Sequence, residues 1–171
     1  MIVIRIYEGF DCILQGLKLD YLKTTCSEAL DKMDWDNLQT RIGCWSDHIE
    51  VVVKVLYAGE RQLCEQVLGR VGDGKYVDEC LYKVAKISML QFLSFGEGVA
   101  RGHRAPEKLF KLLDMFDALD KCMGVARSVF VGERCQELYT KLRELQDMVQ
   151  HQLCACMIIT LCQILNSSFA N

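Results

Sequence analysis

A glycine-rich segment followed by a lysine is the first feature of the sequence that could do chemistry. Gly69, Gly74 and Lys75 fit the spacing of a phosphate-binding loop, in which backbone N–H groups and the lysine hold phosphate oxygens. That loop also needs a serine or threonine after the lysine and a strand before the first glycine. Tyr76 follows here, and a helix is predicted before Gly69. We interpret the segment as a connection between helices and expect no nucleotide cofactor.

A second candidate is a metal site near the C-terminal end of the chain. Its ligands would be His151, Cys154, Cys156 and Cys162. Structural zinc commonly uses two ligand pairs, spaced C-x2-4-C and H-x3-5-H. One C-x-C within an apolar run does not supply these pairs. We therefore expect no metal and interpret the segment as a hydrophobic one.

Histidines are the remaining candidates for acid–base or nucleophilic catalysis. The sequence has three, His48, His103 and His151, and none stands in a motif with serine, cysteine or aspartate. His48 lies between Trp45 and Ile49 in an apolar pattern, which is typical of a half-buried structural histidine. We predict that the protein is not an enzyme and has no catalytic residues.

Four basic side chains form a candidate contact site. They are Arg101, Arg104, Lys108 and Lys111. Lys108 and Lys111 are three residues apart and share a helix face. Arg104 stands just before a predicted helix start, where free N–H groups attract anions. The cluster could bind an anionic lipid or an acidic partner, and the alternative is an ordinary solvated corner between helices.

The composition narrows the class of protein. Of 171 residues, 51% are apolar and 25% charged, which excludes a disordered chain. The net charge of −3 and the absence of a nucleic-acid-reading motif give no reason to expect nucleic acid as a partner. Ten cysteines without a recognisable secretory signal indicate reduced thiols, mostly packed as small hydrophobes.

An apolar run at residues 153–165 raises the question of a membrane. It includes Thr160 and Gln163 and is shorter than the roughly 20 residues that a spanning helix needs. We therefore expect a protein that is soluble, or at most peripheral to a membrane.

Apolar side chains recur every three or four residues along several segments, which predicts helices that each bury one stripe. The first stripe comprises Trp35, Leu38, Ile42, Trp45, Ile49, Val52 and Leu56. The second comprises Leu109, Leu112, Phe116, Leu119, Met123, Ala126 and Phe130. The third comprises Leu138, Leu142, Leu145 and Val149. The segment 80–95 is apolar on several faces and is expected to form a central helix.

Capping and helix-breaking residues mark the expected helix ends. Asp34 is a predicted N-cap, and Thr25 with Glu28 has the spacing of a capping box. Further breaks are expected at glycines 69–74, at Gly102 followed by Pro106, and at Gly132. The sequence therefore predicts an all-α fold, an antiparallel bundle of five or six helices joined by short connections.

Four segments, in order and at the same spacing, resemble one family of plant proteins. Residues 33–45 are similar to the pattern M-x-W-x-x-L-x-x-x-I-x-x-W of the seventy-kilodalton subunit of the exocyst complex. Residues 53–67, 91–95 and 104–115 resemble three further stretches of that family. The resemblance covers about residues 25–130, and residues 1–24 fit loosely as an upstream helix.

The resemblance implies both an architecture and a function. Members are rods of stacked helical bundles, cullin-repeat-like, that act as non-catalytic tethers or scaffolds in exocytosis and dock secretory vesicles at the plasma membrane. Implied partners are other exocyst subunits, small GTPases and phosphoinositide membrane, with a cytoplasmic location peripheral at the plasma membrane or vesicle contact sites. The family's lipid-binding region lies beyond the matched segment, so no lipid-binding residue is transferred. The alternative is a regulatory decoy or immune-type adaptor that uses the same module to bind another protein.

The chain also departs from the family pattern. We expect a truncated member, with residues 1–150 as the helical segment and residues 151–171 as an apolar, divergent tail that covers a bundle face or stays exposed. Ala105 replaces a serine before Pro106. Gly96 and Gly98 replace helix formers, each at an expected cost of up to about 1 kcal/mol.

Overall fold

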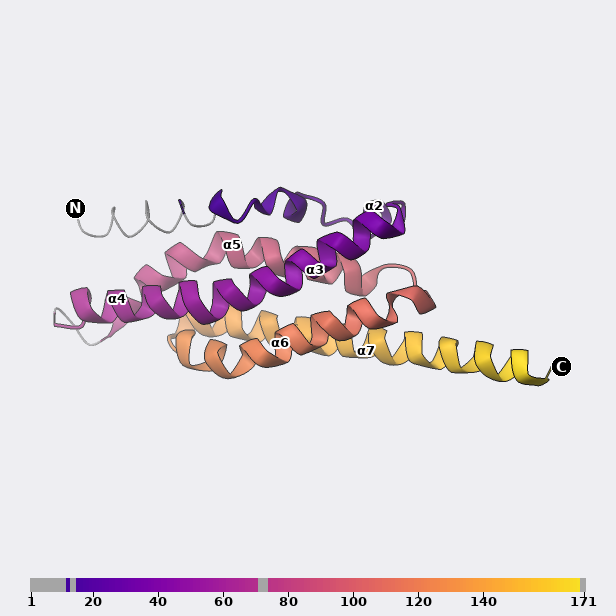
Figure 1. Ribbon diagram of the computed structural model, residues 1–171. Coiled ribbons are helices and arrows are strands. Elements are labelled where there is room, and N and C mark those ends of the chain that lie inside the picture. The colour runs from indigo at the N-terminus through magenta and orange to yellow at the C-terminus, as the bar shows by residue number, and fades with distance from the viewer. Residues whose placement is uncertain (1–11, 13–14, 71–73, 170–171) are drawn as a thin grey trace.

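The computed structural model describes residue 12, residues 15–70 and residues 74–169. Throughout these residues the regular structure is helical and no strand occurs, which confirms the predicted all-α fold (Figure 1). Most of segment 1–24, expected as an upstream helix, lies outside the described residues. Its last part forms the short 3₁₀ helix η1, Leu19–Lys23.

Four long helical rods make up most of the described part of the chain. The first consists of α3 (Trp35–Val51), the π-helical turn η2 (Val52–Tyr57) and α4 (Ala58–Leu68), which follow one another without a break. The others are α5 (Lys75–Arg101), α6 (Leu109–Val129) and α7 (Glu133–Phe169). Besides η1, the short helices among the described residues are α2 (Ser27–Asp31) and the 3₁₀ turn η3 (Pro106–Lys108).

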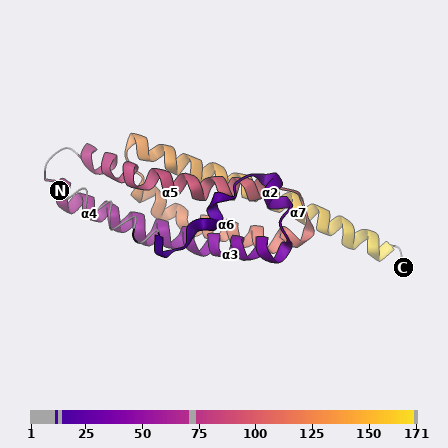
Figure 2. The ribbon, with the colours of Figure 1, turned by 90° about the horizontal axis from the view of Figure 1, so that it is seen from above.

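Consecutive rods run in opposite directions, as the short connections predicted (Figure 1). The main packing partners, however, are α5 with α7, α3 with α6, α6 with α7, and α4 with α5. Of these pairs, α5 with α7 and α3 with α6 run in the same direction (Figures 1 and 2). The connection from α5 to α6 therefore crosses the end of the bundle from one corner to the opposite one.

Most residues of the three predicted stripes are buried in the core. Trp45, Leu112 and Leu142 have no exposed surface, whereas Trp35 and Phe116 are half-buried at its edge. The indole Nε1 of Trp45 donates a hydrogen bond of 2.9 Å to the carbonyl oxygen of Phe92 on α5. This bond fixes the first rod against the central helix at a fully buried position.

Two glycines of α5 explain how closely its neighbours approach. A Cβ at Gly96 would lie 2.7 Å from a methyl carbon of Leu145, and one at Gly98 would overlap the carbonyl oxygen of Thr25. The sequence predicted that these glycines only cost helix stability. The structure corrects that view, since each leaves the space into which another segment packs.

Most predicted helix ends are confirmed. The Asp34 carboxylate accepts a hydrogen bond from the backbone N–H of Asn37 at 2.9 Å. Helix α5 ends at Gly102, Pro106 opens η3, and Gly132 lies between α6 and α7. The capping box predicted at Thr25 is wrong, because α2 begins at Ser27 with Cys26 as its N-cap and no side-chain cap.

Helix α7 continues past the ends of the other rods (Figures 1 and 2). It runs through residue 150 without a break, so the division into a segment 1–150 and a tail 151–171 stays a prediction. All ten cysteines are free thiols. Five of them are buried, whereas the sequence predicted that most would be packed as small hydrophobes.

Candidate functional site

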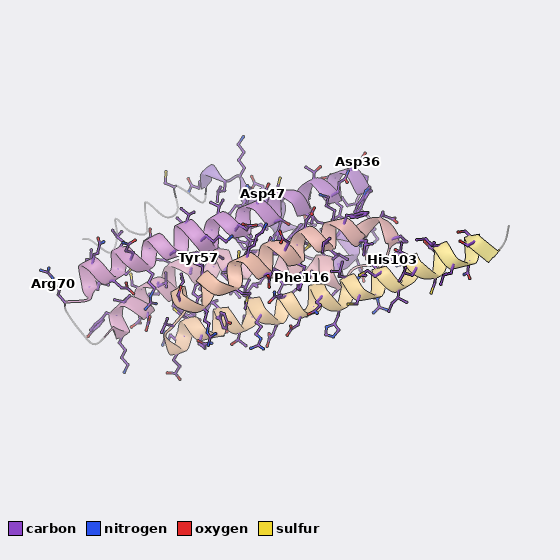
Figure 3. All side chains as sticks on the ribbon, turned by 60° about the horizontal axis from the view of Figure 1, so that its bottom comes forward. Asp36, Asp47, Tyr57, Arg70, His103 and Phe116 are labelled. Atoms are coloured by element: carbon purple, nitrogen blue, oxygen red, sulfur yellow. The ribbon has the colours of Figure 1, made fainter. Side chains whose placement is uncertain are left out.

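The four basic residues singled out in the sequence lie at one corner, where α5 ends and α6 begins. Arg101 is in the last turn of α5, Arg104 in the crossing connection, Lys108 in η3 and Lys111 in the first turn of α6. His103, in the same connection, lies near the point where α7 leaves the bundle (Figure 3). The structure thus brings the predicted cluster together, and it assigns the four side chains different roles.

Lys108 is a structural residue. Its Nζ atom lies 2.8 Å from Oδ1 of Asp31 at the end of α2, and the lysine residue is only 6% exposed. The backbone N–H of His103 donates to both oxygens of the same carboxylate, at 2.9 and 2.7 Å. Lys108 is therefore held inward and does not share an exposed face with Lys111, which corrects the arrangement expected from their spacing.

The environment of Asp31 favours its ionised form. Burial raises the pKa of this carboxyl, but the hydrogen bonds from Lys108 and from the His103 N–H outweigh burial and lower the pKa below its ordinary value. Asp31 therefore accepts hydrogen bonds from two segments that are far away in sequence, and it fastens the crossing connection to α2.

Gln152 of α7 completes the corner, and it was not among the residues singled out from the sequence. Its Nε2 donates a hydrogen bond of 2.9 Å to the carbonyl oxygen of Gly102, at a position where Gln152 is 6% exposed. A signal was present, because Gln152 follows Leu145 and Val149 at the next position of the third stripe. A polar side chain at a buried stripe position needs a partner, and here the partner is the end of α5.

The remaining basic side chains face solvent. Arg101 lies 3.3 Å from Glu97, and Lys111 lies 2.8 Å from Asp114, both as neighbours on their own helices. Arg104 is exposed and, in the part of the chain that the structure describes, it forms no ion pair. Arg104 is thus the cation at this corner that is most available to an anionic group.

The glycine-rich segment has the geometry of a helix connection. Helix α4 precedes it, and α5 begins at Lys75 after Gly74, whose φ of 81° is in the left-handed region. Lys75 lines an open hollow of about 470 Å³ between the starts of α5 and α7. The Arg134 guanidinium there lies 4.0 Å from Glu79 and 6.0 Å from the ring centre of Tyr82, so this cation is already engaged.

The predicted metal candidates do not converge. Cys156 is buried against the bundle, while Cys154 and Cys162 are exposed on the tail. Nδ1 of His151 is hydrogen-bonded to the carbonyl oxygen of Asp147 at 2.8 Å. Among the described residues no group of three histidine, cysteine or acidic side chains could hold a metal ion.

Burial favours the neutral form of four groups that are capable of nucleophilic or acid–base chemistry, three thiols and one histidine. Burial raises the pKa of the Cys64 and Cys122 thiols to about 12 and that of Cys135 to about 11, so the nucleophilic thiolates are disfavoured. Burial also lowers the pKa of His48, whose Nδ1 is hydrogen-bonded to the Tyr21 hydroxyl at 3.0 Å. These groups stabilise the interior in their neutral forms.

Helix α7 also meets the criteria of length and composition for crossing a membrane. An 18-residue window within residues 133–168 has a mean hydropathy of 1.5, and 17% of that window is buried in the bundle. No spanning helix was expected from the apolar run at residues 153–165, because that run is short. Helix α7, which contains the run, is 37 residues long. Core helices of soluble proteins that meet the same criteria are mostly buried, which this window is not.

Comparison with known proteins agrees with the resemblance seen in the motifs. The family model of the C-terminal part of the Exo70 exocyst complex subunit matches residues 43–169. The match extends to residue 169 and so includes most of residues 151–171.

Individual relatives are plant proteins. The chain is 43% identical over 136 residues to exocyst complex component EXO70I of Medicago truncatula, covering 80% of this chain and 19% of the relative. It is 36% identical over 124 residues to exocyst complex component EXO70A1 of Arabidopsis thaliana, covering 72% of this chain and 19% of the relative. The chain therefore spans about a fifth of the length of these relatives, and it belongs to the Exo70 family of exocyst complex subunits.

Proposed function

We propose that the chain is a non-catalytic scaffold module of the exocyst, which helps to tether secretory vesicles to the plasma membrane before fusion. The single observation that carries this proposal is its membership of the Exo70 family across residues 43–169. The corresponding location is the cytoplasm, peripheral to the plasma membrane or to vesicle contact sites.

The state of the polar groups supports action through surfaces rather than through a reaction. Buried thiols keep a raised pKa, and the half-buried His48 has a lowered one. Asp31, Lys108 and Gln152 hold helix ends together. These particular side chains thus stabilise the bundle, which leaves its exposed helix faces as the candidate binding surfaces.

The partners we propose are other exocyst subunits and small GTPases, with phosphoinositide membrane as a further ligand of the assembled complex. Arg104 is the central contact, with Arg101 and Lys111 beside it. Nearby Glu97 and Asp114 partly neutralise this corner, which favours an acidic protein surface over a strongly anionic membrane. The comparisons do not support the alternative role as a decoy or immune-type adaptor.

The test measures binding of the full chain to purified exocyst subunits, one at a time, and to vesicles with and without phosphoinositide. Arg101→Glu with Arg104→Glu should weaken binding to one subunit at least tenfold. Arg127→Glu is the matched control, because Arg127 is an exposed arginine at the far end of α6. Equal binding by the unaltered chain, the double variant and Arg127→Glu would show that this corner is not the contact site. Failure of the unaltered chain to bind any subunit would overturn the scaffold function itself.

A further inference from the structure

Two buried thiols, of Cys64 on α4 and Cys80 on α5, meet in a small apolar cluster. Cys64 has no exposed surface, and Cys80 is 7% exposed. Together with Val77 they form a cluster against which Leu68 packs, and this cluster is separate from the main core of the bundle. The two thiols are also hydrogen-bonded to each other. The fold therefore places two sulfur atoms next to each other on different helices.

The position of this cluster follows from the way in which α4 and α5 are joined. The two helices pack against each other in opposite directions, and the ends that the glycine-rich segment connects lie at one end of the bundle (Figure 2). Cys64 is four residues before Leu68, the last residue of α4, and Cys80 is five residues after Lys75, the first residue of α5. Each thiol is thus about one helical turn from a helix end, at a similar height along the bundle.

Two other buried thiols have backbone partners instead. Sγ of Cys122 donates to the carbonyl oxygen of Ile49 at 3.7 Å, and Sγ of Cys135 donates to the carbonyl oxygen of Asp78 at 3.3 Å. Both cysteines belong to the main core. A carbonyl oxygen offers a thiol no covalent bond, so only a cysteine beside another cysteine is placed for an exchange of electrons.

The small cluster can open without disrupting the main core, because helix ends unfold locally at a lower free energy than the centre of a bundle. Cys80 is the more exposed of the two thiols, so a small oxidant reaches it first. Burial raises the pKa of Cys64 to about 12, with Cys80 and Glu60 adding to the shift and Arg61 opposing it. Cys64 therefore stays protonated and reacts second.

We propose that Cys64 and Cys80 are a redox pair, which a peroxide converts into a disulfide that joins the end of α4 to the start of α5. In the first step the Cys80 sulfur attacks hydrogen peroxide. The O–O bond breaks, an S–O bond forms, the Cys80 proton leaves with the departing hydroxide as water, and Cys80 becomes a sulfenic acid. In the second step the Cys64 sulfur attacks the Cys80 sulfur, the S–O bond breaks, and the released hydroxide takes the Cys64 proton to give a second water. The two thiols thereby lose two electrons to the peroxide.

The disulfide acts as a reversible fastening of the α4–α5 end. It closes the segment 64–80, which includes Gly69, Gly72 and Gly74. Glycines give the unfolded chain additional conformational freedom, and a cross-link across them removes part of it. The oxidised protein is therefore more stable than the reduced one, and a thiol reductant reverses the change. This property does not depend on the scaffold function.

The experiment is disulfide mapping of the full chain after stepwise addition of hydrogen peroxide. The remaining thiols are alkylated in denaturant, and the chain is digested with trypsin without reductant. Trypsin places Cys64 and Cys80 in separate peptides, residues 62–70 and 76–83, and neither contains a second cysteine. These two peptides should be recovered linked, as the main disulfide within one chain, and dithiothreitol should release them.

Variants separate this bond from other oxidation. Cys80→Ser should abolish the linked peptide and leave Cys64 as a thiol, because the reaction begins at Cys80. Cys122→Ser is the matched control, since Cys122 is also buried and the variant should retain the link. The oxidised unaltered chain should melt about 5 °C or more above the reduced chain. Cys80→Ser taken through the same treatment should show no such rise.

Three results would overturn the proposal. The first is recovery of Cys64 and Cys80 as alkylated thiols at a peroxide dose that oxidises the exposed Cys26. The second is a link from either residue to a different cysteine. The third is a linked chain that melts no higher than the reduced chain. The mapping uses the unaltered protein, so it decides the matter even where a variant fails to fold.

Discussion

The Nζ atom of Lys108 lies 2.8 Å from Oδ1 of Asp31, a residue 77 positions earlier in the chain. This ion pair joins α2 to the turn that opens α6, at the end of the bundle that the α5–α6 connection crosses. The pair is a structural element, and it accounts for the burial of a lysine within a basic cluster. The first prediction follows from this geometry.

Lys108→Met should lower the free energy of unfolding by about 1.5–3 kcal/mol at neutral pH, as expected for the loss of a hydrogen bond to a charged group. The change keeps much of the apolar stem but leaves the Asp31 carboxylate without its charged partner. Urea denaturation measures the effect. Lys111→Met is the control, because Lys111 and Asp114 form an exposed pair that should contribute less than about 0.5 kcal/mol. Equal losses in the two variants would contradict the structural role of Lys108.

Gly98→Ala should destabilise the protein by about 1–3 kcal/mol, although alanine is the better helix former. The added methyl group would overlap the carbonyl oxygen of Thr25 and crowd Leu30. Gly124→Ala on α6 is the matched control, since a Cβ there meets nothing within 4 Å, and it should stabilise by up to about 1 kcal/mol. Thermal unfolding of both variants checks the opposite signs, and stabilisation by Gly98→Ala would show that the contact is not tight.

Trp45→Phe should cost about 2 kcal/mol of unfolding free energy, through a smaller ring and the loss of the hydrogen bond to the Phe92 carbonyl oxygen. Trp35→Phe, at the half-buried edge of the same stripe, should cost less than about 1 kcal/mol. Denaturation followed by circular dichroism compares the two. A larger loss from Trp35→Phe would reverse the assignment of which indole anchors the core.

Stability should depend on the protonation of His48. Burial lowers its pKa below the ordinary value of 6.5, while Asp47 opposes this shift. The folded state therefore binds fewer protons than the unfolded state, so this contribution is complete above about pH 6.5 and is lost as the pH falls through the lower, folded pKa. Urea midpoints between pH 5 and 8 should rise with pH more steeply for the unaltered chain than for His48→Gln. Identical slopes would mean that His48 titrates in the folded protein as it does in the unfolded chain.

The local apolar pattern of the sequence was sufficient to predict the helices but not the close contacts between them. Leu138 and Leu145 recur at helical spacing and are buried as expected, because the period alone determines which face is apolar. Thr25 has capping-box spacing and forms no cap, since α2 begins only at Ser27, and its carbonyl oxygen instead lies against Gly98 of α5. Periodicity does not determine which face of a helix packs against which neighbouring helix.

The corner at α5 and α6 shows the same limit for the candidate site. Its four basic residues were identifiable from their proximity in sequence. The burial of Lys108 could not be predicted, because its partner Asp31 lies far away in sequence. Only the connection that crosses the end of the bundle brings the two residues together. Gln152 could have been suspected from its place in an apolar stripe, but its acceptor at Gly102 could not.

The most direct test of the scaffold function is affinity purification of the tagged full chain from plant cells, with quantitative mass spectrometry and the tag alone as control. The account predicts that several other exocyst subunits are enriched together, at comparable ratios. A folded, expressed chain that enriches no exocyst subunit over the control would contradict the account.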